Sequence, residues 1–174
     1  TPPGARAPGA EPRQWNRSAA IATLQFRTSI AAFGLALLVQ LGFLTHHIAL
    51  AAPTLGASGA AALVSGTAVA AFIGRIALAR FSDSVDVRLA AAAMFSGGAV
   101  ALALLAFAAS PLALVVASVA YGLTIGNVTT LSPIIVRREF GAASFGAIYG
   151  VGAMIIGLLS CLGPSLYGWL HDWS

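Results

Sequence analysis

The sequence predicts an all-α protein, a bundle of about five helices that cross a membrane. Three observations predict this class. Of the 174 residues, 59% are hydrophobic and only 8% are charged; the hydrophobic residues gather in five long stretches; and the arginines lie at alternate ends of these stretches. Soluble domains carry about 25% charged residues. The composition therefore excludes a soluble enzyme, a nucleic-acid-binding protein and a disordered chain.

The first 27 residues are predicted to lie outside the membrane. Residues 1–12 are rich in Pro, Gly and Ala, which is typical of a flexible linker. Residues 15–27 mix apolar side chains with arginine, which suits a short helix on the membrane surface. We therefore expect a cytoplasmic linker with a short interfacial helix over 1–27, followed by a transmembrane domain over 28–174.

Five apolar stretches make up the predicted membrane domain. Each is about 20 residues or longer, enough to cross a hydrocarbon layer about 30 Å thick as a helix. A helix also satisfies its own backbone hydrogen bonds in lipid. The predicted spans cover residues 28–51, 59–79, 89–109, 112–136 and 145–169.

The arginines indicate how these spans are oriented. One side of the membrane receives the arginines of residues 1–27, of the loop at 80–88 and of the pair at 137–138. The loops on the other side, at 52–58 and 110–111, carry none. Positive residues favour the cytoplasmic side. We therefore expect the amino end in the cytoplasm, the carboxyl end outside, and residence in a bacterial cytoplasmic membrane.

Arg75 is the first candidate for a binding role, because an arginine inside an apolar span is costly and needs a reason. One interpretation is a cation that lines a cavity and binds an anionic substrate through paired hydrogen bonds. The other is an arginine that extends to the cytoplasmic interface, since Arg80 lies little more than one turn away. The sequence leaves both open.

Further polar residues lie inside the spans and are candidates for cavity positions. Gln40 and His47 are seven residues apart and share one face of the first span. Histidine titrates near neutral pH, which makes a coupling proton, carried by His46 or His47, a further partner. Tyr121 and Asn127 lie in the fourth span. The alternatives are interfacial histidines and polar contacts that hold helices together.

Small residues in the last two spans predict close helix packing. One set lies on one side of the fourth span, and a second set recurs along the fifth. The first set is Ser118, Gly122, Gly126 and Thr129, and the second is Gly146, Gly150 and Gly157.

The loop at residues 79–88, ARFSDSVDVR, resembles the loop signature of the major facilitator superfamily in its second-half copy. Asp83 and Arg88 match the pattern, whereas Ala79 replaces its first glycine. The stretches RREFG and FGAIYG around residue 140, and Gly163-Pro164, resemble later helices of the same half. The resemblance implies helices seven to eleven, a missing amino-terminal six-helix half, and a gating latch of Asp83, Arg80 and Arg88.

Within this superfamily the chain resembles monocarboxylate and oxalate/formate carriers, because Arg75 precedes Asp83 by eight residues. Ala71 stands where monocarboxylate carriers have an acid. The resemblance implies a fragment of a secondary active transporter that works by alternating access, with a small organic anion as substrate. The lipid bilayer is a further partner, and no enzyme activity, cofactor, metal or nucleic acid is expected.

Two other functions remain as alternatives. A non-catalytic membrane scaffold would tolerate replacement of Arg75 by leucine. An intramembrane hydrolase would use Ser58, which opens the second span in a Gly-x-Ser-Gly context, together with a histidine from a later helix. The chain has one cysteine, Cys161, which does not favour a metal site.

Overall fold

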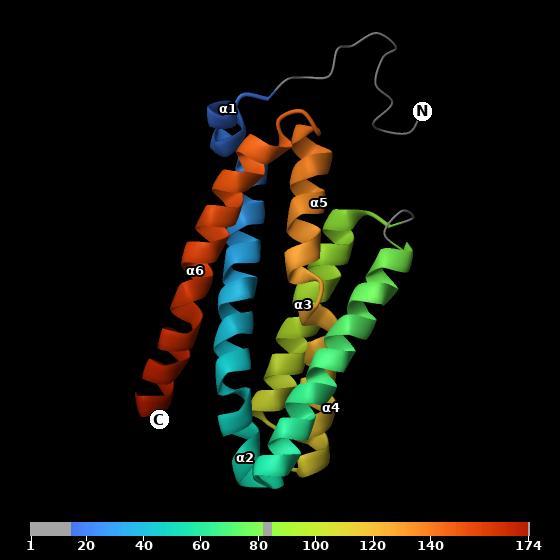
Figure 1. The fold of residues 1–174 in the computed structure, drawn as a ribbon, viewed down its shortest axis with the longest axis vertical. Helices are drawn as coiled ribbons and strands as arrows, with labels where there is room; N and C mark the ends of the chain where they lie inside the picture. Colours follow the sequence, from blue (N-terminus) through green and yellow to red (C-terminus); the bar gives the residue numbers. More distant parts are fainter. Residues whose placement is uncertain (1–14, 82–84, 174) are drawn as a thin grey trace.

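The computed structural model describes residues 15–81 and 85–173. Within these ranges it contains helices and no strand, so the prediction of an all-α membrane helix bundle is confirmed (Figure 1). The helices are α1 (Arg17–Ala22), α2 (Leu24–Phe81), α3 (Val87–Ala106), α4 (Pro111–Ile125), α5 (Val128–Phe140) and α6 (Phe145–Trp173).

The helix α2 contains two spans joined at a single residue. Gly56 has φ 72° and ψ 171°, a conformation that L side chains rarely adopt, so glycine allows the chain to reverse there. We call residues 24–55 the first arm of α2 and residues 57–81 its second arm. From the turn at the lower end of Figure 1, the second arm leads back toward the other end of the bundle and diverges from the first arm.

The fourth predicted span forms two helices. The helix α4 ends at Ile125 and α5 begins at Val128, so a break in the regular helical hydrogen bonding at Gly126 and Asn127 interrupts the stretch predicted over 112–136, although both residues keep right-handed helical φ and ψ angles. This broken span is the central one. Half of its most apolar window is buried, against 22–28% in the other spans.

The break also divides the hydrophobic core into two clusters. One cluster gathers large side chains from the start of α2, from α5 and from α6, with Val128 at its edge. The other gathers residues around the Gly56 turn and from α3 and α4, with Ile125 at its edge. The polar residue Asn127 therefore lies between two apolar layers.

The outer surface of the bundle is apolar, as a lipid environment requires. Phe72 is 63% exposed, Leu158 65% and Leu112 72%. Within residues 15–81 and 85–173, four helices are long and apolar enough to cross a membrane, and α2 accounts for two crossings through its two arms. The chain is an integral membrane protein on this evidence.

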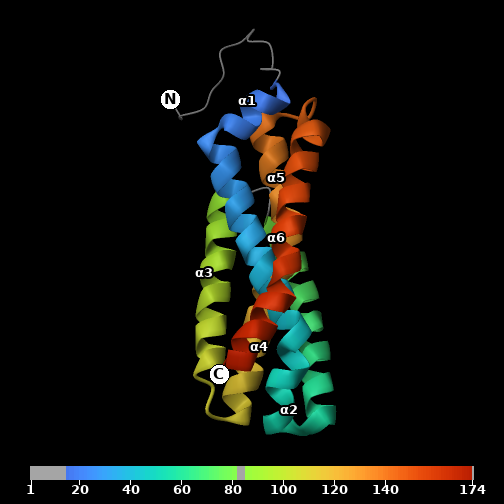
Figure 2. The same ribbon diagram turned by 90° about the vertical axis from the view of Figure 1, so that its left-hand side faces the viewer.

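The ends of the helices separate into two groups. In Figures 1 and 2, the start of α2, the end of its second arm, the start of α3, and the link between α5 and α6 lie toward one end. The Gly56 turn, the link between α3 and α4, and the end of α6 lie at the other. The arginine-bearing segments therefore face one end of the bundle, as the charge pattern predicted.

Glycines bring the second arm of α2 into close contact with the broken span. A Cβ atom on Gly122 would lie 2.6 Å from the Thr67 carbonyl oxygen, and one on Gly126 would overlap the Ala71 carbonyl oxygen. The predicted packing role is therefore confirmed for Gly122 and Gly126.

The corresponding prediction for the last span is wrong within this chain. A Cβ atom on Gly146, Gly150 or Gly157 would meet nothing within 4 Å. The close contacts of α6 with α2 instead use Gly152 and Gly163, which approach Ile30 and the Leu38 carbonyl. Glycine spacing alone does not tell which face of a helix meets a neighbour.

Candidate functional site

The break between α4 and α5 releases two backbone carbonyls from helical hydrogen bonding. In a regular helix the Asn127 N–H would bind the Leu123 oxygen, but here it binds the Thr124 oxygen at 3.3 Å. The Thr130 N–H likewise binds the Asn127 oxygen at 3.1 Å instead of the Gly126 oxygen. Unpaired carbonyls inside a membrane are costly, so both need other donors.

Arg75 donates to one of these carbonyls. Its Nε–H binds the Gly126 oxygen at 2.9 Å, from the second arm of α2 to the break. This contact bears on the two alternatives for Arg75. Gly126 lies 11 residues before Arg137, about 16 Å along the span, so the guanidinium is aimed at the middle of the span and not at the interface.

Arg75 has unused hydrogen-bonding capacity. A guanidinium carries five N–H groups, and Nε supplies one of them. Among the described residues, the structure shows no hydrogen bond from the terminal nitrogens of Arg75, and the residue is exposed. The side chain also borders a pocket of about 120 Å³ that reaches Thr130 and the start of α3. This is an arrangement that can accept an anion.

Asn127 donates to the other carbonyl that the break releases, that of Leu123. Its side chain is fully buried, and its amide nitrogen lies 3.4 Å from the Leu123 oxygen and 3.3 Å from the Gly74 oxygen. The same nitrogen lies 3.5 Å from the Met94 sulfur. Asn127 therefore ties the broken span to the second arm of α2, next to Arg75. Its Oδ1 has no hydrogen-bond partner among the described residues.

The other predicted cavity residues form a separate group nearer the Gly56 turn. His47 is 1% exposed, and its Nε2 lies 3.2 Å from the Ser118 hydroxyl on α4. Phe43 contacts the His47 ring at 4.4 Å between centroids and the Tyr121 ring at 4.7 Å. These side chains pack between the first arm of α2 and α4, and the structure does not bring them to Arg75.

Gln40 and His46, the two remaining polar residues of this part of α2, contact different parts of the protein. Gln40 is half-buried, and its Oε1 is buried without a hydrogen-bond partner among the described residues. His46 is only half-buried, with its ring 6.0 Å from that of Tyr167 on α6. The two histidines therefore face different neighbours, as their adjacent positions on a helix require.

The Ser118–His47 contact has the elements of a nucleophile and base, but the structure gives it no access. Ser118 is fully buried, and Ser58, the serine of the hydrolase alternative, is exposed at the start of the second arm. A hydrolytic site needs room for a reacting carbonyl next to both groups. The pair links the first arm of α2 to α4.

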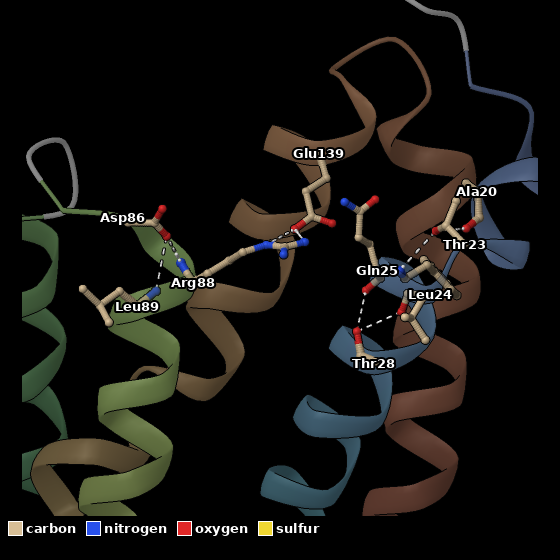
Figure 3. Close-up of polar contacts among 10 residues, drawn as sticks. Ala20, Thr23, Leu24, Gln25, Thr28, Asp86, Arg88, Leu89 and Glu139 are labelled. Atoms are coloured by element: carbon tan, nitrogen blue, oxygen red, sulfur yellow. Dashed lines mark hydrogen bonds and ion pairs between the residues drawn. The ribbon is translucent and has the colours of Figure 1, made fainter. Parts of the chain in front are cut away.

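Two of the predicted latch residues, Arg80 and Arg88, lie at the arginine-bearing end. Asp83 is outside the described residues, and Arg80 is exposed. The Arg88 Nε donates to Glu139 at 2.7 Å, and a terminal nitrogen of Arg88 makes an ion pair with the same oxygen (Figure 3). This pair joins the start of α3 to the end of α5.

Two residues of this end were not singled out from the sequence. Glu139 is the acid that pairs with Arg88, although it lies 51 positions away. Asp86 caps α3, since its side chain accepts from the Arg88 and Leu89 N–H groups at 2.7 and 3.2 Å (Figure 3). An acid just before a helix is a recognisable cap signal, whereas the partner of Glu139 depends on the tertiary fold.

Comparison with known proteins adds no relative. No family model and no curated protein matches the chain. Among the described residues, no three His, Cys, Asp or Glu side chains are grouped in a way that could hold a metal ion. The candidate site is therefore the arginine at the helix break, described by its own geometry.

Proposed function

We propose that this chain is part of a secondary active transporter for a small organic anion, such as a monocarboxylate. The observation that carries the proposal is Arg75, a cation aimed at a mid-span helix break with terminal N–H groups not bound to described residues. Broken helices at the middle of a membrane are typical of transporter binding sites. The loop resemblance to the major facilitator superfamily supports the same class.

In the proposed mechanism, Nε of Arg75 stays on the Gly126 oxygen and the terminal nitrogens bind the carboxylate of the substrate. The Nε contact fixes the guanidinium plane, so the remaining N–H groups are oriented before the anion arrives. Alternating access then exposes the site to one side of the membrane at a time, as substrate binding differs in strength between the two orientations.

Several finer assignments belong to this proposal. The missing amino-terminal half would cover the exposed face that carries Arg75, in a bacterial cytoplasmic membrane with the amino end inside. Arg88 would belong to the cytoplasmic latch with Arg80 and Asp83. His47, Gln40 and Tyr121 would line a part of the pathway nearer the outside, with His47 as the candidate for a coupled proton.

Uptake of labelled lactate and formate tests the role of Arg75. The complete reading frame that encodes the chain is expressed in cells, and Arg75→Gln is compared with the unchanged protein. Glutamine can still donate to the Gly126 oxygen but has no charge, so the fold is kept. We expect uptake to fall at least about tenfold, the effect of losing roughly 1.4 kcal/mol of binding.

Arg27→Gln is the matched control, because Arg27 is an exposed arginine in the first turn of α2, just before the span predicted over 28–51. It should leave uptake and expression unchanged. If Arg75→Gln transports both anions as fast as the unchanged protein, Arg75 does not bind substrate. A protein that moves neither anion would remove monocarboxylates from the proposal.

A further inference from the structure

The pocket beside Arg75 extends from the helix break toward the arginine-bearing end of the bundle. On the second arm of α2 its lining reaches from Arg75 to Ala79, about 6 Å along the helix. On α5 the lining reaches from Thr130 to Ile134, over the same rise. The start of α3 supplies a third wall at Val87. Arg75 therefore lies at the inner end of a short cavity.

This cavity combines one charge with apolar walls. Among the described residues that line it, Arg75 alone is charged, and Thr130 is the only other polar residue. The rest of the lining is hydrocarbon, with Leu78 from α2, Ala90 from α3 and Leu131 from α5. Apolar groups gain free energy when they leave water for such walls, whereas a second charge would lose its hydration there. The cavity therefore fits an anion with one charged group and a short hydrocarbon chain.

The walls of the cavity are held in place by the core of the protein. Val87 is 6% exposed and Leu131 2%, and both belong to the hydrophobic cluster formed with the start of α2, α5 and α6. Leu78 and Ile134 pack against the same cluster. By contrast, Arg75 is exposed, so its side chain is open to an incoming anion. A cavity formed in advance lowers the cost of ordering the protein on binding.

The volume of the cavity limits the length of the hydrocarbon chain. It measures about 120 Å³, which corresponds to roughly four groups of the size of a water molecule. A carboxylate at Arg75 and the three further carbon atoms of butyrate fill such a space. The longer chain of hexanoate exceeds it.

Ala79 is placed to set this limit. It lies four residues after Arg75, so both residues are on the same face of α2, and Ala79 lines the cavity one turn nearer the arginine-bearing end. Its small side chain leaves room for the end of a bound chain. Ala79 is also exposed, so a larger residue can replace it without disturbing the core.

We propose that this cavity receives the hydrocarbon chain of the anion bound by Arg75, and that Ala79 limits the chain to about three carbon atoms beyond the carboxylate. This inference rests on the proposed function and narrows it to short monocarboxylates. Dicarboxylates are excluded, because their second carboxylate would lie among apolar walls without a counter-charge.

Equilibrium binding of isotope-labelled acids to the whole chain in lipid nanodiscs tests this assignment, with protein-free nanodiscs correcting for partition into lipid. The probes are formate, acetate, propionate, butyrate and hexanoate. We expect affinity to rise up to about fourfold for each methylene group as far as butyrate, and hexanoate to bind no more tightly than butyrate. Succinate has as many carbon atoms as butyrate but two carboxylates, and it should bind at least about tenfold more weakly.

Two leucine variants of α2 test the role of Ala79. Ala79→Leu places additional carbon atoms in the cavity. Ala77→Leu is the matched control, because Ala77 is exposed, does not line the cavity and points about 200° away around the helix. We expect Ala79→Leu to weaken butyrate binding at least about tenfold and to leave formate binding unchanged. Ala77→Leu should bind both acids like the unchanged chain, and circular dichroism should show equal helix content in both variants.

Three results would overturn the inference while formate binding still depends on Arg75. They are an affinity that does not change with chain length, succinate binding as tight as that of butyrate, and butyrate binding that Ala79→Leu and Ala77→Leu affect equally. The proposed function fails in a different way. If formate does not bind, or binds as tightly to Arg75→Gln as to the unchanged chain, Arg75 is not the anion site and this inference is wrong as well.

Discussion

At the scale of single residues, the centre of the molecule depends on two side chains that replace lost backbone hydrogen bonds. Arg75 donates to the Gly126 oxygen, and Asn127 donates to the Leu123 oxygen. Each satisfies a carbonyl that the helix break leaves without its regular donor. The arginine is thus both a structural partner of the break and the only described cation so deep in a span, and variants must separate these roles.

The Arg88–Glu139 pair leads to a prediction of unequal effects. The Glu139 side chain is 16% exposed and that of Arg88 54%. Arg88→Ala leaves a largely buried carboxylate without its partner, whereas Glu139→Ala leaves an arginine that water can reach. We expect Arg88→Ala to cost about 1–2 kcal/mol of stability and Glu139→Ala clearly less.

Thermal unfolding in lipid nanodiscs, followed by circular dichroism, measures this difference. The double variant should be no less stable than Arg88→Ala alone, because it removes the unpaired acid. Equal effects of the two single variants would show that the pair contributes nothing beyond its exposed charges.

The sequence predicted some of these residues and not their partners. An arginine within an apolar span is conspicuous because of its cost, so Arg75 could be singled out. Its partner is the backbone oxygen of Gly126, and the residue types in the sequence do not indicate which backbone oxygens lack a helical donor. The His47–Ser118 contact joins positions 71 apart, and only the fold shows that these two side chains meet.

At the scale of helices, the broken span and the second arm of α2 are in contact through glycine. A Cβ atom on Gly74 would overlap the Leu123 carbonyl oxygen, while one on Gly66, in the same arm, would meet nothing within 4 Å. Contacts of this kind allow dispersion and weak Cα–H···O interactions between backbones.

Alanine at these two glycines should have opposite effects. Gly74→Ala forces the helices apart and should cost about 1–3 kcal/mol, the usual effect of overpacking. Gly66→Ala should be neutral or stabilising by up to about 1 kcal/mol, since alanine favours a helix. Unfolding measurements on the pair check this. A loss of stability in both variants would mean that helix geometry, and not the contact, is responsible.

The span lengths were predictable, but the interruption at Gly126 and Asn127 was not. Long apolar stretches fix where helices lie in lipid. Glycine and asparagine both occur in continuous membrane helices, so neither residue marks a break. The break is stable here because Arg75 and Asn127 supply the missing donors, and that is a property of the assembled bundle.

At the scale of the whole molecule, the prediction concerns orientation in the membrane. With Cys161→Ser as background, single cysteines are placed at Ser58, near the Gly56 turn, and at Ala143, in the link between α5 and α6. Arginine-bearing segments favour the cytoplasm. We therefore expect a membrane-impermeant maleimide to label S58C in intact cells and A143C only after permeabilisation.

Labelling of A143C from outside intact cells would reverse the orientation. It would also change the side of the membrane on which the Arg88–Glu139 pair acts. The overall arrangement of spans would stand, because it follows from the apolar helices themselves.

Because α2 turns at Gly56, the thickness of the bilayer helps to determine how this helix folds. As one straight rod, the 58 residues of α2 would extend about 87 Å, nearly three times the hydrocarbon depth of about 30 Å. A straight α2 is therefore too long for the hydrocarbon layer of a bilayer, whatever the sequence of the turn. A detergent micelle imposes no such flat boundary, so the hairpin should be better defined in bilayers than in micelles. In a bilayer, Gly56 is the position at which α2 bends to stay within the hydrocarbon layer.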